Sequence, residues 1–70
     1  MTDIKIKTEN IKLDSFLKLS GESESGGQAK ERINSGEVFV NKEVCFSRGK
    51  KLNPGDSVSI GTNEYRVVSQ

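Results

Sequence analysis

The spacing of the apolar residues changes at Gly36, and this change limits the chain to a fold that combines helices with strands. Before it, Ala29 and Ile33 recur four residues apart, the spacing of one helical face. After it, Val38 and Val40 recur two residues apart, the spacing of one strand face. Glycine suits the boundary because it adopts the left-handed conformation that often ends a helix. The pattern predicts an α+β fold.

A first short helix is predicted just after the N-terminal segment. Leu13, Phe16 and Leu17 stand at i, i+3 and i+4, so they share one face of a helix. Asp14 suits the first turn, and Gly21 suits the C-terminal end. This segment is therefore expected to be amphipathic and to pack its apolar face on a core.

A second helix is predicted to start in the small polar stretch at residues 25–30, which reads SGGQAK. The stretch resembles a linker or a phosphate-binding loop, but it lacks the Lys-Ser/Thr pair and the preceding strand of the known loop motifs. Ser25 followed three residues later by Gln28 fits a capping box, whose side chains satisfy free amides at a helix start. The two helices then form a short hairpin.

The remaining segments predict strands. The NPGD sequence at residues 53–56 is strong turn chemistry, because proline presets its dihedral angle and glycine permits positive φ. We expect one domain over residues 1–70, with a two-helix hairpin packed on a small, mainly antiparallel sheet of three to five short strands. The predicted strands are an edge strand at Ile4–Ile6, Val38–Val40 leading into a tight turn at Asn41-Lys42, a return strand with Val44 and Phe46, and a terminal hairpin of residues 57–60 and 64–68.

Composition excludes several kinds of site. The chain has no histidine and one cysteine, Cys45, so the commonest general base, disulfides within the chain and thiolate-rich zinc sites are missing. We expect no enzyme activity, no cofactor and no metal, with Cys45 as a partly buried packing residue. No segment has the apolar length of a signal peptide or a membrane span, which predicts a soluble cytoplasmic protein without a membrane partner.

The basic residues are clustered, although the net charge is only +1. Arg48, Lys50 and Lys51 add three positive charges within four residues. Lys30 flanks the buried stripe of the second helix and is predicted to lie beside Lys18 of the first helix. A charge run is usually a solvated surface, so the pattern alone leaves open whether this one binds a ligand.

The order of motifs is similar to that of the S-four domain, a small RNA-binding module also called the alpha-L motif. The matching segments, at residues 11–60, are KLDSFLKL, SGGQAK, GEVFVN and PGDSVSI. The SESG-x-QAK segment and the basic SRGKKL loop further resemble the free-standing YbcJ/YaaA family of small bacterial proteins. Four short motifs in one order and spacing are more specific than any single motif.

The resemblance implies that the helical hairpin and the basic loop at residues 47–51 bind structured RNA, ribosomal or transfer RNA. It implies a role in ribosome assembly or translation, with the ribosome as a further partner, and a monomer without catalytic activity. Two positions depart from the superfamily pattern: Gly26 replaces a frequent arginine, and Lys42 replaces a frequent glycine. The residues at matching positions are Lys30, Arg48 and Lys51, and the additional candidate contacts are Lys12, Lys18, Arg32, Lys42 and Lys50.

The main alternative is a protein-interaction module that keeps the fold with weak or no RNA affinity. The near-neutral net charge and the glycine at position 26 are consistent with it. A small enzyme is a further alternative with little support, because no serine or cysteine has a basic partner at a recognisable spacing.

Overall fold

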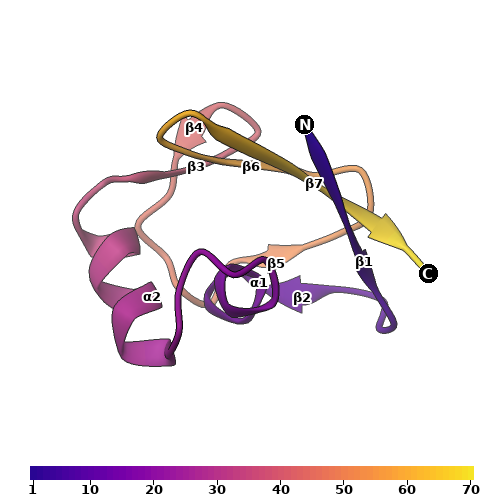
Figure 1. Cartoon of the computed structure of the whole chain (residues 1–70), viewed down its shortest axis with the longest axis horizontal. Coiled ribbons are helices and arrows are strands. Elements are labelled where there is room, and N and C mark those ends of the chain that lie inside the picture. The colour runs from indigo at the N-terminus through magenta and orange to yellow at the C-terminus, as the bar shows by residue number, and fades with distance from the viewer.

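The computed structural model describes all residues, 1–70, and has two layers (Figure 1). A five-stranded sheet forms one layer, and the two helices with a two-stranded sheet form the other. The α+β prediction, with a helical hairpin against a sheet, is confirmed. In chain order the elements are β1 (Thr2–Ile6), β2 (Ile11–Lys12), α1 (Leu13–Leu19), α2 (Gly26–Asn34), β3 (Val38–Val40), β4 (Glu43–Val44), β5 (Lys51–Leu52), β6 (Ser57–Ile60) and β7 (Asn63–Ser69).

The large sheet has the strand order β1-β7-β6-β3-β4, with β1 at one edge as predicted. Only β1 pairs in parallel, with β7, and the other pairs are antiparallel. Ile60 pairs with Asn63, so the β6–β7 turn has two residues instead of the predicted three. Asn41 and Lys42 form the predicted tight β3–β4 turn with φ angles of 50° and 72°.

The small sheet, β2 with β5, was not predicted. Ile11 pairs with Leu52, and Lys12 pairs with Lys51. Each strand has two residues, which is too short to produce a period-2 signal in the sequence. The prediction that Lys51 belongs to a loop is therefore corrected: the residue lies on β5.

The helix starts and ends follow the predicted caps. The Ser25 hydroxyl accepts a hydrogen bond from the Gln28 amide at 3.2 Å, and α2 begins at Gly26, directly after Ser25. The Gln28 side chain accepts from the Glu24 amide at 2.9 Å, one residue earlier than a standard capping box. Gly21 and Gly36 follow the two helices with φ near +86° and +82°. Neither helix has the length and apolar character needed to cross a membrane.

The core lies between the two layers. The Phe16 ring packs edge-on against Tyr65 of β7, with ring centroids 6.2 Å apart, and this contact joins α1 to the sheet. Cys45 packs on the margin of the core, as predicted. The buried apolar side chains are Ile6, Leu13, Phe16, Leu17, Ala29, Ile33, Val38, Val40, Leu52, Val58, Ile60 and Val67.

The return strand is shorter than predicted, because β4 ends at Val44. Phe46 lies beyond the strand and is 60% exposed. The prediction that Phe46 belongs to the return strand is thus wrong, and its ring lies beside Gly36.

Asn41 links the β3–β4 turn to the turn at residues 53–56. Its side chain donates to the Asp56 carboxylate at 3.2 Å and accepts from the Ser57 amide at 3.0 Å. The Asp56 carboxylate also accepts from the Asn53 amide at 2.8 Å, and Gly55 has φ near +100°. The side chains of Asn41 and Asp56 therefore connect the β3–β4 turn to the turn at residues 53–56.

Candidate nucleic-acid interface

The loop at residues 48–50 is fixed against the start of α1 by backbone hydrogen bonds. The Leu13 amide donates to the Lys50 carbonyl at 2.9 Å, and the Asp14 amide donates to the Arg48 carbonyl at 3.1 Å. These amides belong to the first turn of a helix and have no partner within the helix itself. The basic loop thus caps α1 with its carbonyl groups, and its position relative to the helix is set by the fold.

The β2–β5 pair adds two lysines to the same place. Lys12 immediately precedes α1, and its partner across the pair is Lys51, which immediately follows the loop. The side chain of Lys12 makes no capping hydrogen bond. We call the four residues that meet here the basic cluster, and all four are exposed: Lys12, Arg48, Lys50 and Lys51.

The cations of the basic cluster have no carboxylate partner. Both ion pairs in the structure involve Arg32, and neither includes a residue of the cluster. An exposed, unpaired lysine or arginine keeps its full charge available to an anion. The cluster therefore has the composition and accessibility of a phosphate-binding surface.

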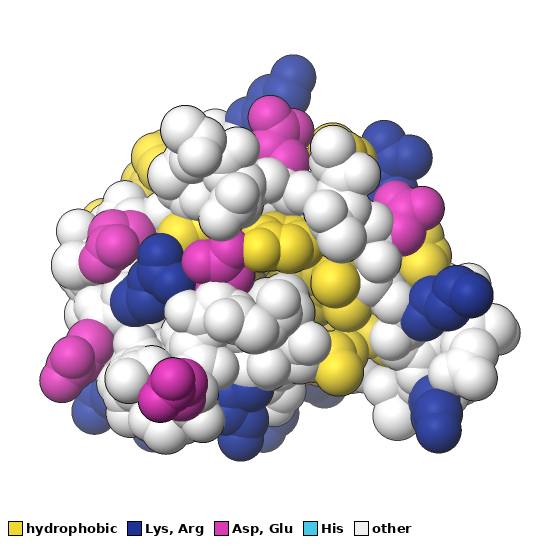
Figure 2. Space-filling view, viewed as in Figure 1, with side chains coloured by type: hydrophobic (Ala, Val, Ile, Leu, Met, Phe, Trp, Pro, Cys, Tyr) yellow, Lys and Arg dark blue, Asp and Glu magenta, His cyan; other side chains and the backbone are white.

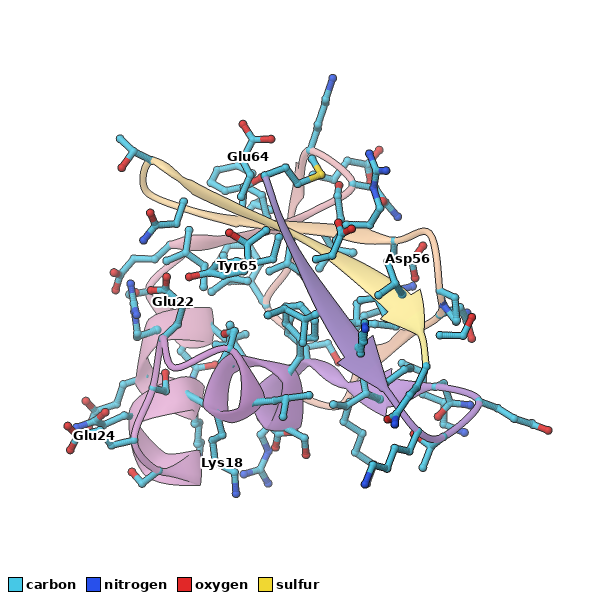
Figure 3. All side chains as sticks on the ribbon, turned by 45° about the vertical axis from the view of Figure 1, so that its right-hand side comes forward. Lys18, Glu22, Glu24, Asp56, Glu64 and Tyr65 are labelled. Carbon is cyan, nitrogen blue, oxygen red and sulfur yellow. The ribbon has the colours of Figure 1, made fainter.

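Lys18 and Lys30 extend the cationic surface along the helical layer. Lys18 lies in the last turn of α1, and its side chain extends away from the large sheet (Figure 3). Lys30 is exposed on α2, directly after the buried Ala29. Both lysines lack ion-pair partners. That the Lys18 and Lys30 side chains lie beside each other remains a prediction. The basic cluster with Lys18 and Lys30 is called the basic face below.

Lys42 lies on the other layer, in the β3–β4 turn. Its neighbours Asn41 and Glu43 line an open surface hollow together with Lys50 of the basic cluster. Val40, Val44 and Cys45 complete the lining. The hairpin that carries Lys42 therefore borders the basic cluster, although Lys42 is not part of the helical layer.

Arg32 is placed differently from the other predicted contacts, because carboxylates occupy its guanidinium group. One nitrogen donates to the Glu22 carbonyl at 2.6 Å and to the Glu22 carboxylate at 3.0 Å. Another lies 3.6 Å from Glu37. The same Glu22 carboxylate accepts from the Tyr65 hydroxyl and, at 2.9 Å, from Asn63 (Figure 3).

The hydrogen-bond network around Glu22 was missed by sequence reasoning, since the residues bonded to Glu22 lie 10 to 43 positions away from it. The hydrogen bond from Tyr65 lowers the pKa of Glu22, burial opposes this effect, and the hydrogen bonds from Arg32 and Asn63 add to it. The hydrogen bond to Glu22 and burial raise the pKa of Tyr65. The network ties the interhelical segment to β7 and has a structural role.

Charges of opposite sign are unevenly distributed over the surface (Figure 2). On the face shown, the charged side chains at the lower right, near the turn between β1 and β2, are lysine or arginine, whereas the left side mixes both signs. No group of three or more His, Cys, Asp or Glu side chains is arranged to hold a metal ion.

A helical hairpin on a mixed sheet, with unpaired cations at the start of α1, defines a small module that binds polyanions. The family model for the S4 domain matches residues 4–68, and the chain belongs to this family. The family is the S-four domain of the sequence motifs, so the predicted resemblance is confirmed. It is an RNA-binding, non-catalytic family, in agreement with the absence of enzyme activity expected from the sequence.

Individual relatives cover nearly the whole chain. The chain is 46% identical over 67 residues to the probable ribosome maturation protein RlbA of Bacillus subtilis, covering 94% of each protein. It is 38% identical over 63 residues to the putative RNA-binding protein YbcJ of Escherichia coli, covering 90% of each. The solution structure of YbcJ, described as revealing an alfaL motif involved in RNA-binding, matches with a TM-score of 0.73 and 36% identity over 97% of this chain and 87% of that one.

Proposed function

We propose that this S4-domain protein binds structured RNA, ribosomal or transfer RNA, through its basic face, and that it acts in ribosome maturation. The observation that carries the proposal is the meeting of Lys12, Arg48, Lys50 and Lys51 at the start of α1 without a carboxylate partner. The names of the relatives support the class of ligand and the process. The protein acts as a monomer in the cytoplasm, where ribosomes mature.

The mechanism is electrostatic. Each lysine or arginine that contacts a phosphate releases condensed counterions, so affinity falls steeply as salt rises. The backbone bonds from Leu13 and Asp14 to the loop hold part of the cationic surface in place before RNA binds. A pre-positioned surface loses less conformational entropy on binding than a free loop would.

Recognition by RNA shape is favoured over recognition of bases. The major groove of an A-form helix is too narrow for side chains to read, and single-stranded readers need exposed aromatic rings for stacking. The basic face includes no aromatic residue: Phe16 is buried, Tyr65 is bonded to Glu22, and the exposed Phe39 and Phe46 lie on β3 and just after β4. Phosphate spacing along a folded RNA is the feature that such a face can distinguish.

Charge reversal tests the proposal. The variant carries Lys30→Glu, Arg48→Glu and Lys51→Glu, and a control with the same net charge carries Lys5→Glu, Lys7→Glu and Arg66→Glu. Binding to transfer RNA and to ribosomal RNA fragments is measured across salt concentrations. The first variant should bind at least about tenfold more weakly, with a salt slope reduced by about one for each lost phosphate contact. Equal affinity of the two variants would contradict the assigned site.

The same measurement separates RNA binding from the alternative of a protein-interaction module without RNA affinity. The alternative is supported if the wild-type protein binds transfer RNA and ribosomal RNA fragments no more tightly than a neutral protein of the same size. Matching DNA hairpins distinguish recognition of the A-form from general attraction to phosphates, because their grooves have different dimensions.

A further inference from the structure

The open hollow between the β3–β4 hairpin and the basic loop contains the one carboxylate that borders the basic cluster. Its volume is about 380 Å³, and two of its six lining residues are charged: Glu43 of β4 and Lys50 of the basic cluster. Pockets of about 300–1,000 Å³ hold small ligands. The hollow therefore has room for a single sugar–phosphate unit of a nucleic acid.

Glu43 lies on the face of the large sheet that is directed toward the helical layer. It is the cross-strand partner of Val40, and residues directly opposite each other on two strands lie on the same face. Val40 is buried in the core between the two layers. The Glu43 side chain therefore starts on the side of the sheet where the basic cluster lies.

Glu43 and Lys50 line the same hollow without binding each other. Neither side chain forms an ion pair, and both are exposed. An ammonium group binds an anion, and a carboxylate accepts hydrogen bonds from hydroxyl or amine donors. Two such groups that stay apart at one hollow can bind two different parts of one ligand, an anion and a hydrogen-bond donor.

RNA supplies both parts within one nucleotide. Its phosphate is an anion, and its ribose carries a 2′-hydroxyl that DNA lacks. Carboxylates accept a hydrogen bond from this hydroxyl in dinucleotide-binding proteins. Glu43 repels phosphate, so it favours the sugar, and the apolar lining by Val40, Val44 and Cys45 suits the carbon atoms of the sugar ring. Because Lys50 belongs to both the hollow and the basic cluster, an RNA backbone bound on the cluster continues directly into the hollow.

We propose that Glu43 recognises the ribose of bound RNA. Lys50 binds a phosphate, and the Glu43 carboxylate accepts a hydrogen bond from the 2′-hydroxyl of the nucleotide in the hollow. The inference rests on the proposed function, because it concerns the same RNA. It adds a residue that distinguishes RNA from DNA by the sugar itself, which contacts to phosphate alone do not do.

The test compares an RNA with its 2′-fluoro copy of the same sequence. Fluorine keeps the A-form geometry and the phosphates but cannot donate a hydrogen bond. The RNA is the fragment of transfer or ribosomal RNA that the wild-type protein binds most tightly, and the wild type should prefer it over the copy by about three- to tenfold. In Glu43→Ala this preference should fall below about twofold, while affinity for the 2′-fluoro copy is equal or higher because a negative charge is lost.

Two further variants are the controls, and amide spectra of the ¹⁵N-labelled proteins verify their fold. Glu43→Gln should keep an intermediate preference, because its amide oxygen still accepts a hydrogen bond. Glu64→Ala makes the same charge change as Glu43→Ala on a side chain that points away from the helical layer (Figure 3), and its preference should equal that of the wild type.

Two outcomes would overturn the proposal, and they differ in what they leave standing. An equal preference of the wild type and Glu43→Ala for RNA over the 2′-fluoro copy would exclude Glu43 as the ribose contact, while RNA binding by the basic face stands. If the wild type binds neither nucleic acid, RNA binding itself is excluded, and the role of Glu43 with it.

Discussion

Lys12 and Lys51 are direct partners across the β2–β5 pair, so two positive side chains start from adjacent backbone positions. No carboxylate forms an ion pair with either side chain. Like charges placed opposite each other destabilise a sheet by a few tenths of a kcal/mol to about 1 kcal/mol. A bound phosphate would relieve this repulsion, which links the stability of the small sheet to RNA binding.

The first prediction separates stability from binding at this pair. Lys51→Glu places opposite charges across the pair and should stabilise the fold by about 0.2–1 kcal/mol, while it weakens RNA binding. Lys50→Glu should weaken RNA binding to a similar degree without the gain in stability, because Lys50 has no cross-strand partner. Urea unfolding and RNA titration of both variants provide the comparison. A loss of stability in Lys51→Glu would contradict the unrelieved repulsion.

The second prediction concerns Gly26, where related domains often carry arginine. A Cβ atom added at this position meets no atom within 4 Å, and the backbone does not have positive φ. Gly26→Arg should therefore fold normally and increase RNA affinity several-fold through one added phosphate contact.

Gly26→Gln is the matched control for helix propensity. Glutamine should stabilise α2 by up to about 1 kcal/mol relative to glycine, and arginine somewhat less because a cation is unfavourable at a helix N-terminus. RNA affinity should rise only with arginine. If both variants bind as the wild type does, the start of α2 lies outside the RNA interface.

The third prediction assigns Arg32 to stability instead of RNA binding. Arg32→Gln removes hydrogen bonds to Glu22 and should destabilise the fold by about 1–2 kcal/mol. Its RNA affinity should change by less than about twofold, because carboxylates already occupy the guanidinium group. Lys30→Gln should show the reverse pattern. Weakened RNA binding with unchanged stability in Arg32→Gln would return Arg32 to the interface.

The fourth prediction follows from the lowered pKa of Glu22. A carboxylate whose pKa is lower in the folded state stabilises the fold at neutral pH, and this contribution is lost as pH falls through the folded pKa. Wild-type stability should therefore decline below the ordinary glutamate pKa of about 4.3. Glu22→Gln should be less stable at pH 7 and show a shallower decline in that range.

Urea unfolding at several pH values between about 3 and 7 measures this difference. Glu24→Gln is the control, because Glu24 is exposed and its carboxylate accepts no hydrogen bond. If the free energy of unfolding of the wild type and of Glu22→Gln changes with pH in parallel, ionisation of Glu22 does not contribute to the stability of the fold.

Local patterns in the sequence predict much of this fold, and contacts between distant residues account for the rest. Ser25 and Gln28 are three residues apart, and the helix start that they indicate is confirmed. Asn41 and Lys42 interrupt an alternating pattern, and the turn there is also confirmed. The sequence predicts these features because the residues that form each of them are only a few positions apart in the chain.

The parts of the site that were not predicted depend on pairings across the chain. Lys12 and Lys51 are 39 positions apart, and the strands that join them have two residues each. Glu22 meets Tyr65 across 43 positions. No local signal distinguishes Arg32, which is paired, from Lys30, which is free. Only the structure therefore shows which lysine and arginine side chains have no carboxylate partner and are free to bind an anion.

The most direct test of the RNA interface is an amide-shift map of the ¹⁵N-labelled protein with transfer RNA or a ribosomal RNA fragment. The largest shifts are expected at residues 12–14, 18, 30 and 48–51, with smaller shifts at the β3–β4 turn. The outer-sheet positions Phe39, Ser59 and Glu64 should not move. Shifts centred on those outer-sheet positions, with the start of α1 unaffected, would contradict RNA binding at the basic face.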